Sequence, residues 1–381
     1  MAVVVIHGIG VREEGFTRLA QRCEPILRRY LLQPLGLGAI ETRWVYWGKH
    51  GASFAWDLGS LPRRRVLEPL GAMPLMKAQA VHYTALADLV GNDMPTENLL
   101  LQAAQHDLPV LANLLVTLAI ADADTHPETL IALYEAARSP DTQHAVQNAH
   151  SDDELLQILA DALNAQPTRS PERMGATLTE SLNAVLSRVA QTISRLTYHP
   201  RATLQKLLRP ALTPLVAQLM GDVMTYLAHR GERETPGAIL QAVRNALTPA
   251  PDEPLIVLTH SMGGNIFYDL IHYYAPEVQV NAWVSVAGQV GLFEELKLFK
   301  ASDPAVRFPN RVAKSPNLGC WLNVYDPVDV LGFAATPIFD GVEDMPYQTG
   351  LGWAAHAMPS YFAAPRFYET LAPKLAASLR R

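Results

Sequence analysis

The chain has 381 residues, of which 49 % are hydrophobic and 18 % charged, a balance typical of a globular protein with a sizeable core. Its formal net charge of −6 argues against a nucleic-acid partner, because binding a phosphate backbone requires a basic surface. The longest uncharged apolar run, residues 108–121, is shorter than the ~20 residues that cross a bilayer, so we expect no transmembrane segment. The amino terminus lacks the basic region of a signal peptide, and the two cysteines lack Cys-x-x-Cys spacing. We therefore expect a cytoplasmic protein with reduced cysteines, and the sequence carries no signal for its oligomeric state.

Strand and helix patterns alternate at the start of the chain. Residues 2–6 are a β-branched run typical of a buried strand. Residues 13–32 then have helical spacing, and residues 39–47 alternate as a second strand would. Strand, helix and strand in this order predict a βαβ unit within a parallel sheet.

The pattern changes in the middle of the chain, where strand signals almost vanish. We predict helices there over residues 98–121, 127–138, 153–164, 175–195 and 202–218. Exposed connectors are expected at residues 143–153 and 165–173. These helices would form a large insertion that covers residues 61–215.

Strand and helix patterns alternate again after the insertion. We predict helices over residues 219–229, 236–247, 263–274 and 365–380, and strands over residues 255–258, 282–286 and 320–325. The predicted fold is therefore α/β, with a mostly parallel central sheet formed by residues 1–60 and 216–381 and flanked by helices. A second domain that folds independently is the competing interpretation. The insertion is favoured because the first strand needs the later strands as partners.

The stretch VLTHSMGGNIFY, residues 257–268, contains a serine where a predicted buried strand turns into a helix. Ser261 could be an ordinary helix N-cap, since serine is common at that position. A cap does not require Gly263 and Gly264 directly after it. A nucleophile on a tight strand–turn–helix does require them, because its backbone is strained and neighbouring Cβ atoms would collide with adjacent strands. The pattern therefore favours a nucleophilic serine.

This stretch resembles the Gly-x-Ser-x-Gly nucleophile elbow of the α/β-hydrolase superfamily, with Thr259 at the first glycine position. The resemblance covers the residues outside the insertion and implies an oxyanion hole made of two backbone amides. One would come from Met262, the residue after the nucleophile. The other would come from the loop after an earlier strand, and VVVIHGIG has that form. The resemblance assigns this donor to Ile9, with Gly8 as the alternative.

A serine nucleophile needs an imidazole to accept its proton. In the superfamily the chain order is serine, acid, histidine, and only His272 and His356 lie beyond the serine turn. His272 belongs to the helix directly after the nucleophile and precedes every credible acid. His356 lies in a loop-like stretch before the last helix and is therefore the expected base. His260 adjoins Ser261, but we expect its side chain to point elsewhere on the turn.

The acid that orients the imidazole should follow the last predicted strand, where NVYDPVDVLG contains Asp326 and Asp329. The segment is similar to a stretch of DDHD-type phospholipases, and this resemblance implies Asp329, although Val330 replaces a proline of that pattern. The other aspartate would cap its own turn. Glu343 and Asp344 are further alternatives.

Together these residues predict an esterase- or lipase-like serine hydrolase that cleaves a carboxylic ester, a lipid-like ester included, through an acyl-enzyme. The helical insertion would be a cap that shapes the substrate pocket, or else an inert structural element. The alternative function is a non-catalytic α/β-hydrolase-like protein that binds a lipid or a partner protein. A thioesterase or an amidase would share the same machinery.

No cofactor or metal is expected from the sequence. His144, His150 and His199 lack the spacing of metal ligands, and no glycine-rich phosphate-binding loop is present. The expected partner is a small-molecule or lipid ester substrate.

Overall fold

The computed structural model of the protein describes residues 2–60, 98–119, 126–165, 217–247, 255–351 and 355–380. Its centre is a six-stranded sheet with the order β2–β1–β5–β6–β7–β8, in which every neighbouring pair is parallel. The strands are β1 (Ala2–Ile6), β2 (Glu41–Val45), β5 (Leu255–His260), β6 (Val280–Val286), β7 (Leu318–Tyr325) and β8 (Val342–Pro346). A separate antiparallel hairpin pairs β3 (Gly231–Glu232) with β4 (Thr235–Pro236). The α/β class and the mostly parallel sheet are therefore confirmed.

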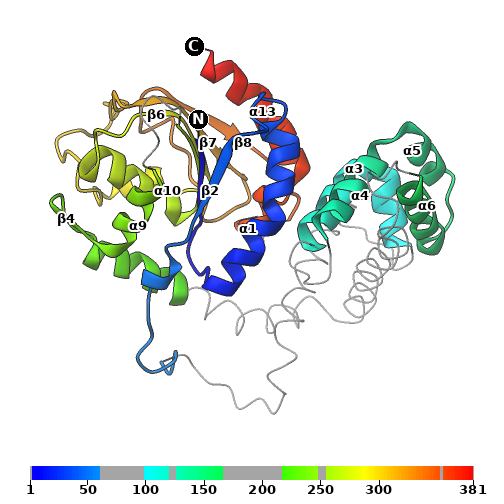
Figure 1. Ribbon diagram of the computed structural model, residues 1–381, viewed down its shortest axis with the longest axis horizontal. Coiled ribbons are helices and arrows are strands. Elements are labelled where there is room, and N and C mark those ends of the chain that lie inside the picture. The colour runs from blue at the N-terminus through cyan, green and yellow to red at the C-terminus, as the bar shows by residue number, and fades with distance from the viewer. Residues whose placement is uncertain are drawn as a thin grey trace.

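Helices cover both faces of this sheet (Figure 1). They are α1 (Glu13–Leu27), α9 (Ala238–Ala246), α10 (Met262–Asp269), α11 (Val290–Glu295), α12 (Pro359–Phe362) and α13 (Pro365–Leu379). The π-helical segments η1 (Arg28–Leu32) and η3 (Leu270–Tyr274) continue α1 and α10, η2 (Gly48–His50) is a short 3-10 turn, and residues 217–229 are helical. None of the described helices combines the length and the apolar character that a bilayer crossing requires.

The first strand shows why both faces need cover. All five residues of β1 are buried. Val3 and Val5 pack in a core with α1 and α13, whereas Val4 and Ile6 pack in a second core with α9 and α10. Successive side chains of a strand point to opposite faces, so a continuous apolar run indicates a strand that is covered on both sides.

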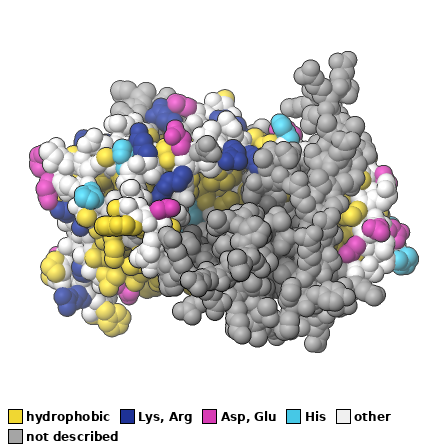
Figure 2. All heavy atoms as spheres, turned by 90° about the horizontal axis from the view of Figure 1, so that it is seen from below, with side chains coloured by type: hydrophobic (Ala, Val, Ile, Leu, Met, Phe, Trp, Pro, Cys, Tyr) yellow, Lys and Arg dark blue, Asp and Glu magenta, His cyan; other side chains and the backbone are white. Residues whose placement is uncertain are grey.

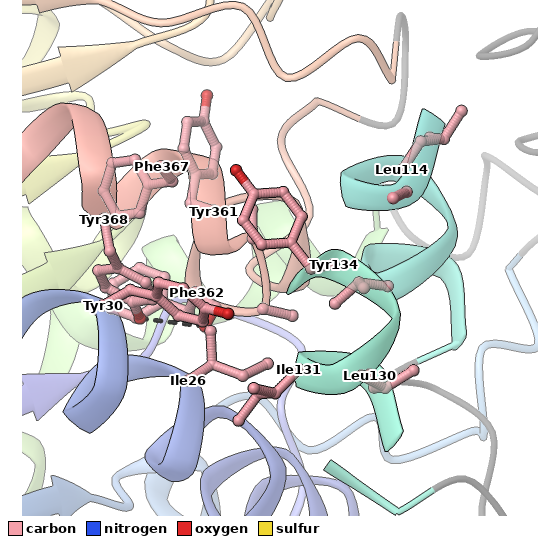
Figure 3. Packing of buried hydrophobic residues seen from close by; sticks show 14 of the residues in the cluster. Ile26, Tyr30, Leu114, Leu130, Ile131, Tyr134, Tyr361, Phe362, Phe367 and Tyr368 are labelled. Carbon is pink, nitrogen blue, oxygen red and sulfur yellow. Dashed lines mark hydrogen bonds between the residues drawn. The ribbon is translucent and has the colours of Figure 1, made fainter. Parts of the chain in front are cut away.

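Four further helices come from the segment predicted to be an insertion: α3 (Leu99–Ala119), α4 (Pro127–Arg138), α5 (Pro140–Gln147) and α6 (Asp152–Asn164). They join the core that holds α1 and α13, and Figure 3 shows α4 side chains packed beside aromatic residues of α12 and α13. At this interface Tyr134 donates a hydrogen bond to Glu369 at 2.8 Å, and Tyr30 donates one to Glu135 at 2.8 Å. This helical group therefore packs on one flank of the sheet. The boundary between sheet domain and insertion remains a prediction.

Some sequence predictions were wrong in detail. The connector predicted at 143–153 is partly helical, because Pro140 occupies the first turn of α5, where its fixed φ favours helix formation. Strand β8 was not predicted, since VEDMP contains two acidic residues and ends in proline. Both are tolerated because β8 is the edge strand of the sheet. The helices predicted over 175–195 and 202–218 lie outside the described residues, except for residues 217 and 218, which are helical.

Candidate active site

The carboxyl ends of β1 and β5 meet at the centre of the sheet, where the chain order reverses. Strand β2 lies on one side of β1 and β5 lies on the other. Open parallel sheets bind ligands at such a switch point, outside the carboxyl ends of the strands. The loop after β1 and the turn after β5 are in contact here, since a Cβ atom on Gly8 would lie 2.9 Å from Ser261 Cβ.

Ser261 occupies the turn between β5 and α10 in a strained backbone conformation, with φ 51° and ψ −127°. Its side chain makes no capping hydrogen bond to α10. The ordinary N-cap interpretation is therefore wrong. Strain of this kind is costly for a residue with a side chain, and it is found mainly where function demands it. The backbone amide of Ser261 donates to Val286 O at 2.9 Å, which fixes the turn against β6.

The residues around the serine explain Gly263 and Thr259 of this turn. A Cβ atom on Gly263 would lie 2.7 Å from the backbone oxygens of Ile6 and His7, so no side chain fits there. Thr259 lies at the first glycine position of the resembled pattern and is fully buried. Its Oγ1 accepts a hydrogen bond from Trp283 Nε1 at 2.9 Å. The threonine is thus part of the core and leaves the turn undisturbed.

The structure brings together three residues that are far apart in the sequence. Ser261 Oγ lies 2.9 Å from His356 Nε2, and His356 Nδ1 lies 2.9 Å from Asp329 Oδ2. The carboxylate also accepts the Leu331 amide through Oδ1 at 2.9 Å. The Asp329 side chain is 1 % exposed and that of His356 is 19 % exposed. A buried carboxylate next to Nδ1 keeps the proton on that nitrogen, so Nε2 is free to accept the serine proton.

The other acidic candidates are engaged elsewhere. Asp326 Oδ2 accepts hydrogen bonds from the Thr349 amide at 2.7 Å and from Thr349 Oγ1 at 2.8 Å. Glu343 forms an ion pair with Lys374, and Asp344 accepts backbone amides of the loop before β8. Asp326 is therefore an anchor for its loop, as expected for the aspartate that does not face the histidine.

The other two histidines near the turn, His260 and His272, have hydrogen-bond partners other than Ser261. His272 Nδ1 pairs with Tyr268 O at 2.8 Å within the helix after the serine, so it does not contact Ser261. His260 Nε2 lies 2.9 Å from the backbone oxygen of His356. Burial lowers the pKa of His260 well below its usual value, which keeps the ring neutral, and Nε2–H then donates to that oxygen. In the described part of the chain His260 makes no hydrogen bond to Ser261; it holds the loop of His356 instead, which the sequence did not reveal.

Gln289, in the loop that follows β6, is a further residue that the sequence analysis missed. Its Nε2 donates to Ala287 O at 2.9 Å and to Leu331 O at 2.8 Å, and it lies 3.4 Å from Ser261 Oγ. Both amide hydrogens are committed to backbone carbonyls, so Gln289 ties the loop after β6 to the loop that carries the acid. A polar residue at the carboxyl end of a central strand is the signal that could have identified it.

The backbone amides assigned to the oxyanion hole are available. Met262 begins α10, and the first amides of a helix have no partner within the helix. Neither the Met262 amide nor the Ile9 amide donates to another residue in the described part of the chain. Both could therefore donate to a substrate oxygen.

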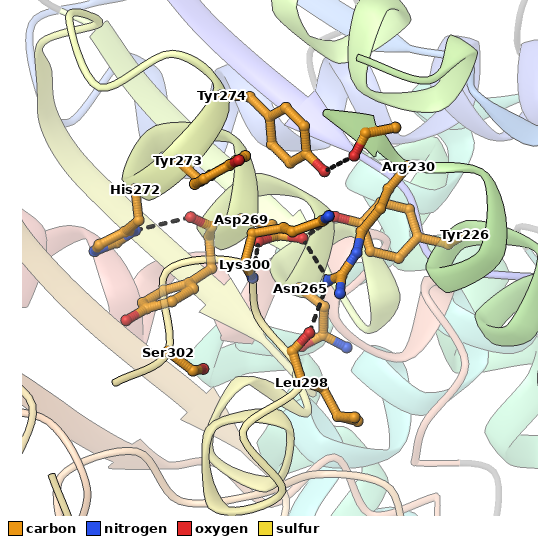
Figure 4. Close-up of polar contacts among 12 residues, drawn as sticks. Tyr226, Arg230, Asn265, Asp269, His272, Tyr273, Tyr274, Leu298, Lys300 and Ser302 are labelled. Carbon is orange, nitrogen blue, oxygen red and sulfur yellow. Dashed lines mark hydrogen bonds and ion pairs between the residues drawn. The ribbon is translucent and has the colours of Figure 1, made fainter. Parts of the chain in front are cut away.

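A buried polar network fixes the other end of α10 (Figure 4). Asp269 accepts hydrogen bonds from Tyr226 at 2.7 Å, from Arg230 at 3.0 Å and from the Lys300 amide at 2.9 Å. The Asp269 side chain is fully buried, and these donors compensate its charge. The helix that follows the serine is therefore held rigidly.

Exposed apolar side chains lie on loops that follow the strands and on the helix over residues 217–229. Val328 and Val330 flank Asp329 and are 59 % and 87 % exposed. Trp56 follows β2, and Met220 and Met224 lie on the helix over residues 217–229. Figure 2 views the molecule from this edge of the sheet and shows hydrophobic side chains gathered on its described part. The surroundings of the site are therefore partly apolar.

Within the described ranges, no group of three or more histidine, cysteine, aspartate and glutamate side chains could hold a metal ion. Comparison with known proteins finds no matching family, no similar curated protein and no similar solved structure. The chemistry of the site must therefore be argued from its geometry.

Proposed function

We propose that the protein is a serine hydrolase that cleaves a carboxylic ester through an acyl-enzyme on Ser261. The observation that carries this proposal is the line of hydrogen bonds from Ser261 Oγ through His356 to Asp329. A helix cap would need neither the strained turn nor an imidazole at hydrogen-bond distance. The same machinery could act on a thioester or an amide.

In the proposed reaction, Ser261 Oγ attacks the ester carbonyl while His356 Nε2 takes its proton. The amides of Ile9 and Met262 stabilise the oxyanion, and the imidazolium then protonates the leaving alkoxide. Water then attacks the acyl carbonyl while His356 takes its proton, and the imidazolium returns that proton to Ser261 Oγ as the acyl–oxygen bond breaks and the acid leaves. Asp329 keeps the imidazole in the required tautomer and stabilises its charged form.

Membership of the α/β-hydrolase superfamily is part of the proposal. It is supported by a parallel sheet with the serine after a central strand, and by a histidine and an acid that both follow later in the chain. In this proposal the segment 61–215, from which α3, α4, α5 and α6 come, borders the site as a cap. Helix α3 packs against α12, which begins three residues after His356.

The apolar side chains near the site favour an ester with a hydrophobic portion. Val330 is next to Asp329 and its side chain is largely exposed, although hydrophobic side chains gain by leaving water. An apolar substrate chain would cover such residues. A series of nitrophenyl esters of increasing acyl length tests this expectation. We expect kcat/KM to rise with acyl length, and a constant or falling value would contradict it.

The alternative, a non-catalytic binding protein, is favoured in the sequence by Thr259 at the first glycine position and by the presence of two candidate acids. Thr259 packs in the core, and only Asp329 of the two aspartates reaches His356. A fluorophosphonate probe, which reacts with activated serines, tests the two functions directly. We expect Ser261 to be labelled and the Ser261→Ala variant to be unlabelled while retaining its fold. A folded wild type that neither reacts with the probe nor hydrolyses esters would refute the enzyme.

A further inference from the structure

His7 precedes the loop that contains the expected oxyanion donor, and its hydrogen bonds define its tautomer. The Trp47 amide donates to His7 Nε2 at 3.2 Å, so this nitrogen carries no proton. The ring is 1 % exposed, and burial lowers the pKa of His7 to about 4, so it is neutral near pH 7. The proton therefore lies on Nδ1, which donates to the carbonyl oxygen of Gly8.

This hydrogen bond also determines where the next amide points. The carbonyl of Gly8 and the N–H of Ile9 belong to one trans peptide, in which they point in opposite directions. The His7 ring stacks on Trp47, with ring centroids 4.9 Å apart, and Trp47 follows β2. If the Gly8 carbonyl faces the β2 side with His7 and Trp47, the Ile9 amide faces the β5 side, because β2 and β5 flank β1 on opposite sides. Ser261 follows β5.

Asp222 holds the following peptide of the same loop. Its Oδ2 accepts the Gly10 amide at 2.9 Å, and its Oδ1 accepts the Ala52 amide at 2.7 Å. The Asp222 side chain is fully buried, and Arg12 lies 3.4 Å from Oδ1 and balances its charge. Gly10 has a φ of +71°, which glycine adopts without strain. Two consecutive peptides are thus held by two buried side chains.

We propose that His7 and Asp222 are positioning residues that fix the loop over residues 8–10 and thereby aim the Ile9 amide at the developing oxyanion. This inference rests on the proposed function. The two side chains touch neither the substrate nor the reacting atoms. They act because an oxyanion donor stabilises the transition state only if it is oriented before the reaction begins.

The helix over residues 217–229 explains how Asp222 keeps its place. Tyr226 lies one turn after Asp222 on this helix and donates to Asp269 of α10. One helix therefore contacts the oxyanion loop through Asp222 and the helix after the nucleophile through Tyr226. This second contact provides a matched control, because Tyr226→Phe removes a buried hydrogen bond without touching the loop.

The experiment compares Asp222→Asn, Tyr226→Phe, His7→Ala and His7→Asn in the full-length protein. End-point labelling of Ser261 by a fluorophosphonate counts the folded sites. The kcat and KM for a nitrophenyl ester are then expressed per labelled site, and the melting temperature is measured alongside.

Removing an oxyanion donor lowers kcat by about 10²–10³-fold, so displacing one should lower it by about 10- to 100-fold. We expect this loss in Asp222→Asn and His7→Ala, with KM nearly unchanged. Tyr226→Phe should lower the melting temperature and keep its kcat per site. His7→Asn should recover part of the loss, because its amide nitrogen can replace Nδ1 as the donor to Gly8.

Three results would overturn the inference, and the third would refute the proposed function as well. If the wild type is labelled at Ser261 while Asp222→Asn and His7→Ala keep the wild-type kcat per site, only the positioning role fails. The same holds if Tyr226→Phe loses as much kcat as Asp222→Asn. If the folded wild type is neither labelled nor active, the proposed function and the positioning role fail together.

Discussion

Replacing Asp329 with asparagine tests whether the carboxylate beside His356 takes part in catalysis. Asp329 Oδ1 accepts the Leu331 amide and Oδ2 faces His356 Nδ1. In the variant, the asparagine oxygen should stay with the Leu331 amide, because an amide nitrogen there would face an N–H group. The asparagine nitrogen then points at Nδ1, which must become an acceptor, so the proton moves to Nε2. An Nε2 that carries a proton cannot accept one from Ser261.

The expected size of this effect follows from the tautomer change. The equivalent aspartate-to-asparagine change in a serine protease triad lowers kcat by about 10⁴-fold with the geometry intact. We expect a loss of that order in kcat for a nitrophenyl ester. The free energy of unfolding should change little, because both hydrogen bonds of the side chain are kept with one of them reversed.

Asp326→Asn is the matched control, since this aspartate is buried in the same loop. Its two oxygens accept the Val328 amide and two donors of Thr349. An asparagine must place its nitrogen against at least one of these donors, which costs about 1.5–3 kcal/mol or more, since a hydrogen bond to a charged group contributes that much. The variant should melt earlier and retain most of its kcat per folded site. An active Asp329→Asn together with a stable, inactive Asp326→Asn would show that the two roles had been assigned the wrong way round.

The remaining predictions concern the turn and the buried histidines. Gly263→Ala should destabilise the protein by about 3 kcal/mol or more, because its Cβ would lie 2.7 Å from two backbone oxygens. Gly264→Ala should cost only about 1 kcal/mol, since its Cβ would lie 3.3 Å from Thr259 Oγ1. Urea unfolding of both variants checks this, and an equal loss of unfolding free energy in the two would show that Gly263 is not held by the clash. Stability should also fall as the pH drops, because the unfolded chain protonates His7 below about pH 6.5 while the folded chain does so only near pH 4. The contribution of neutral His7 to the free energy of unfolding is fully present above pH 6.5 and falls by about 3 kcal/mol toward pH 4. Buried His260 lowers the free energy of unfolding in acid for the same reason. Urea unfolding at pH 7 and pH 5 measures the slope, and a His7→Asn variant that is no less sensitive to acid would refute the assignment.

Much of the site was predictable from short sequence patterns. The run VVVIHGIG and the stretch LTHSMGG each place a glycine-rich turn directly after a buried strand, and such turns depend on local backbone constraints. Gly10 needs a positive φ, and Gly263 needs the absence of a side chain. The residues next to Asp326 and Asp329 do not show which of the two aspartates faces His356, because both follow β7 in one short loop. Which of them faces His356 depends on how that loop folds over Thr349.

Other features of the site have a weak sequence signal or none. His260 and Gln289 hold the loops of His356 and Asp329 by hydrogen bonds to backbone carbonyl groups. Every residue has such a group, so these contacts produce no pattern of residue types. Asp222 contacts an amide more than 200 residues away, at Gly10. Contacts of this kind form only when the chain has folded, so local patterns do not report them.

The sequence by itself determined the α/β class, the strand that precedes Ser261 and the choice of His356 as the proposed base, because buried β-branched runs, glycines after strands and chain order are local or countable features. The tertiary structure decided which carboxylate meets the imidazole and which buried side chains hold the surrounding loops. The physical reason is that hydrogen bonds between distant segments depend on the position of every strand and helix between them, whereas a turn depends mainly on its own residues.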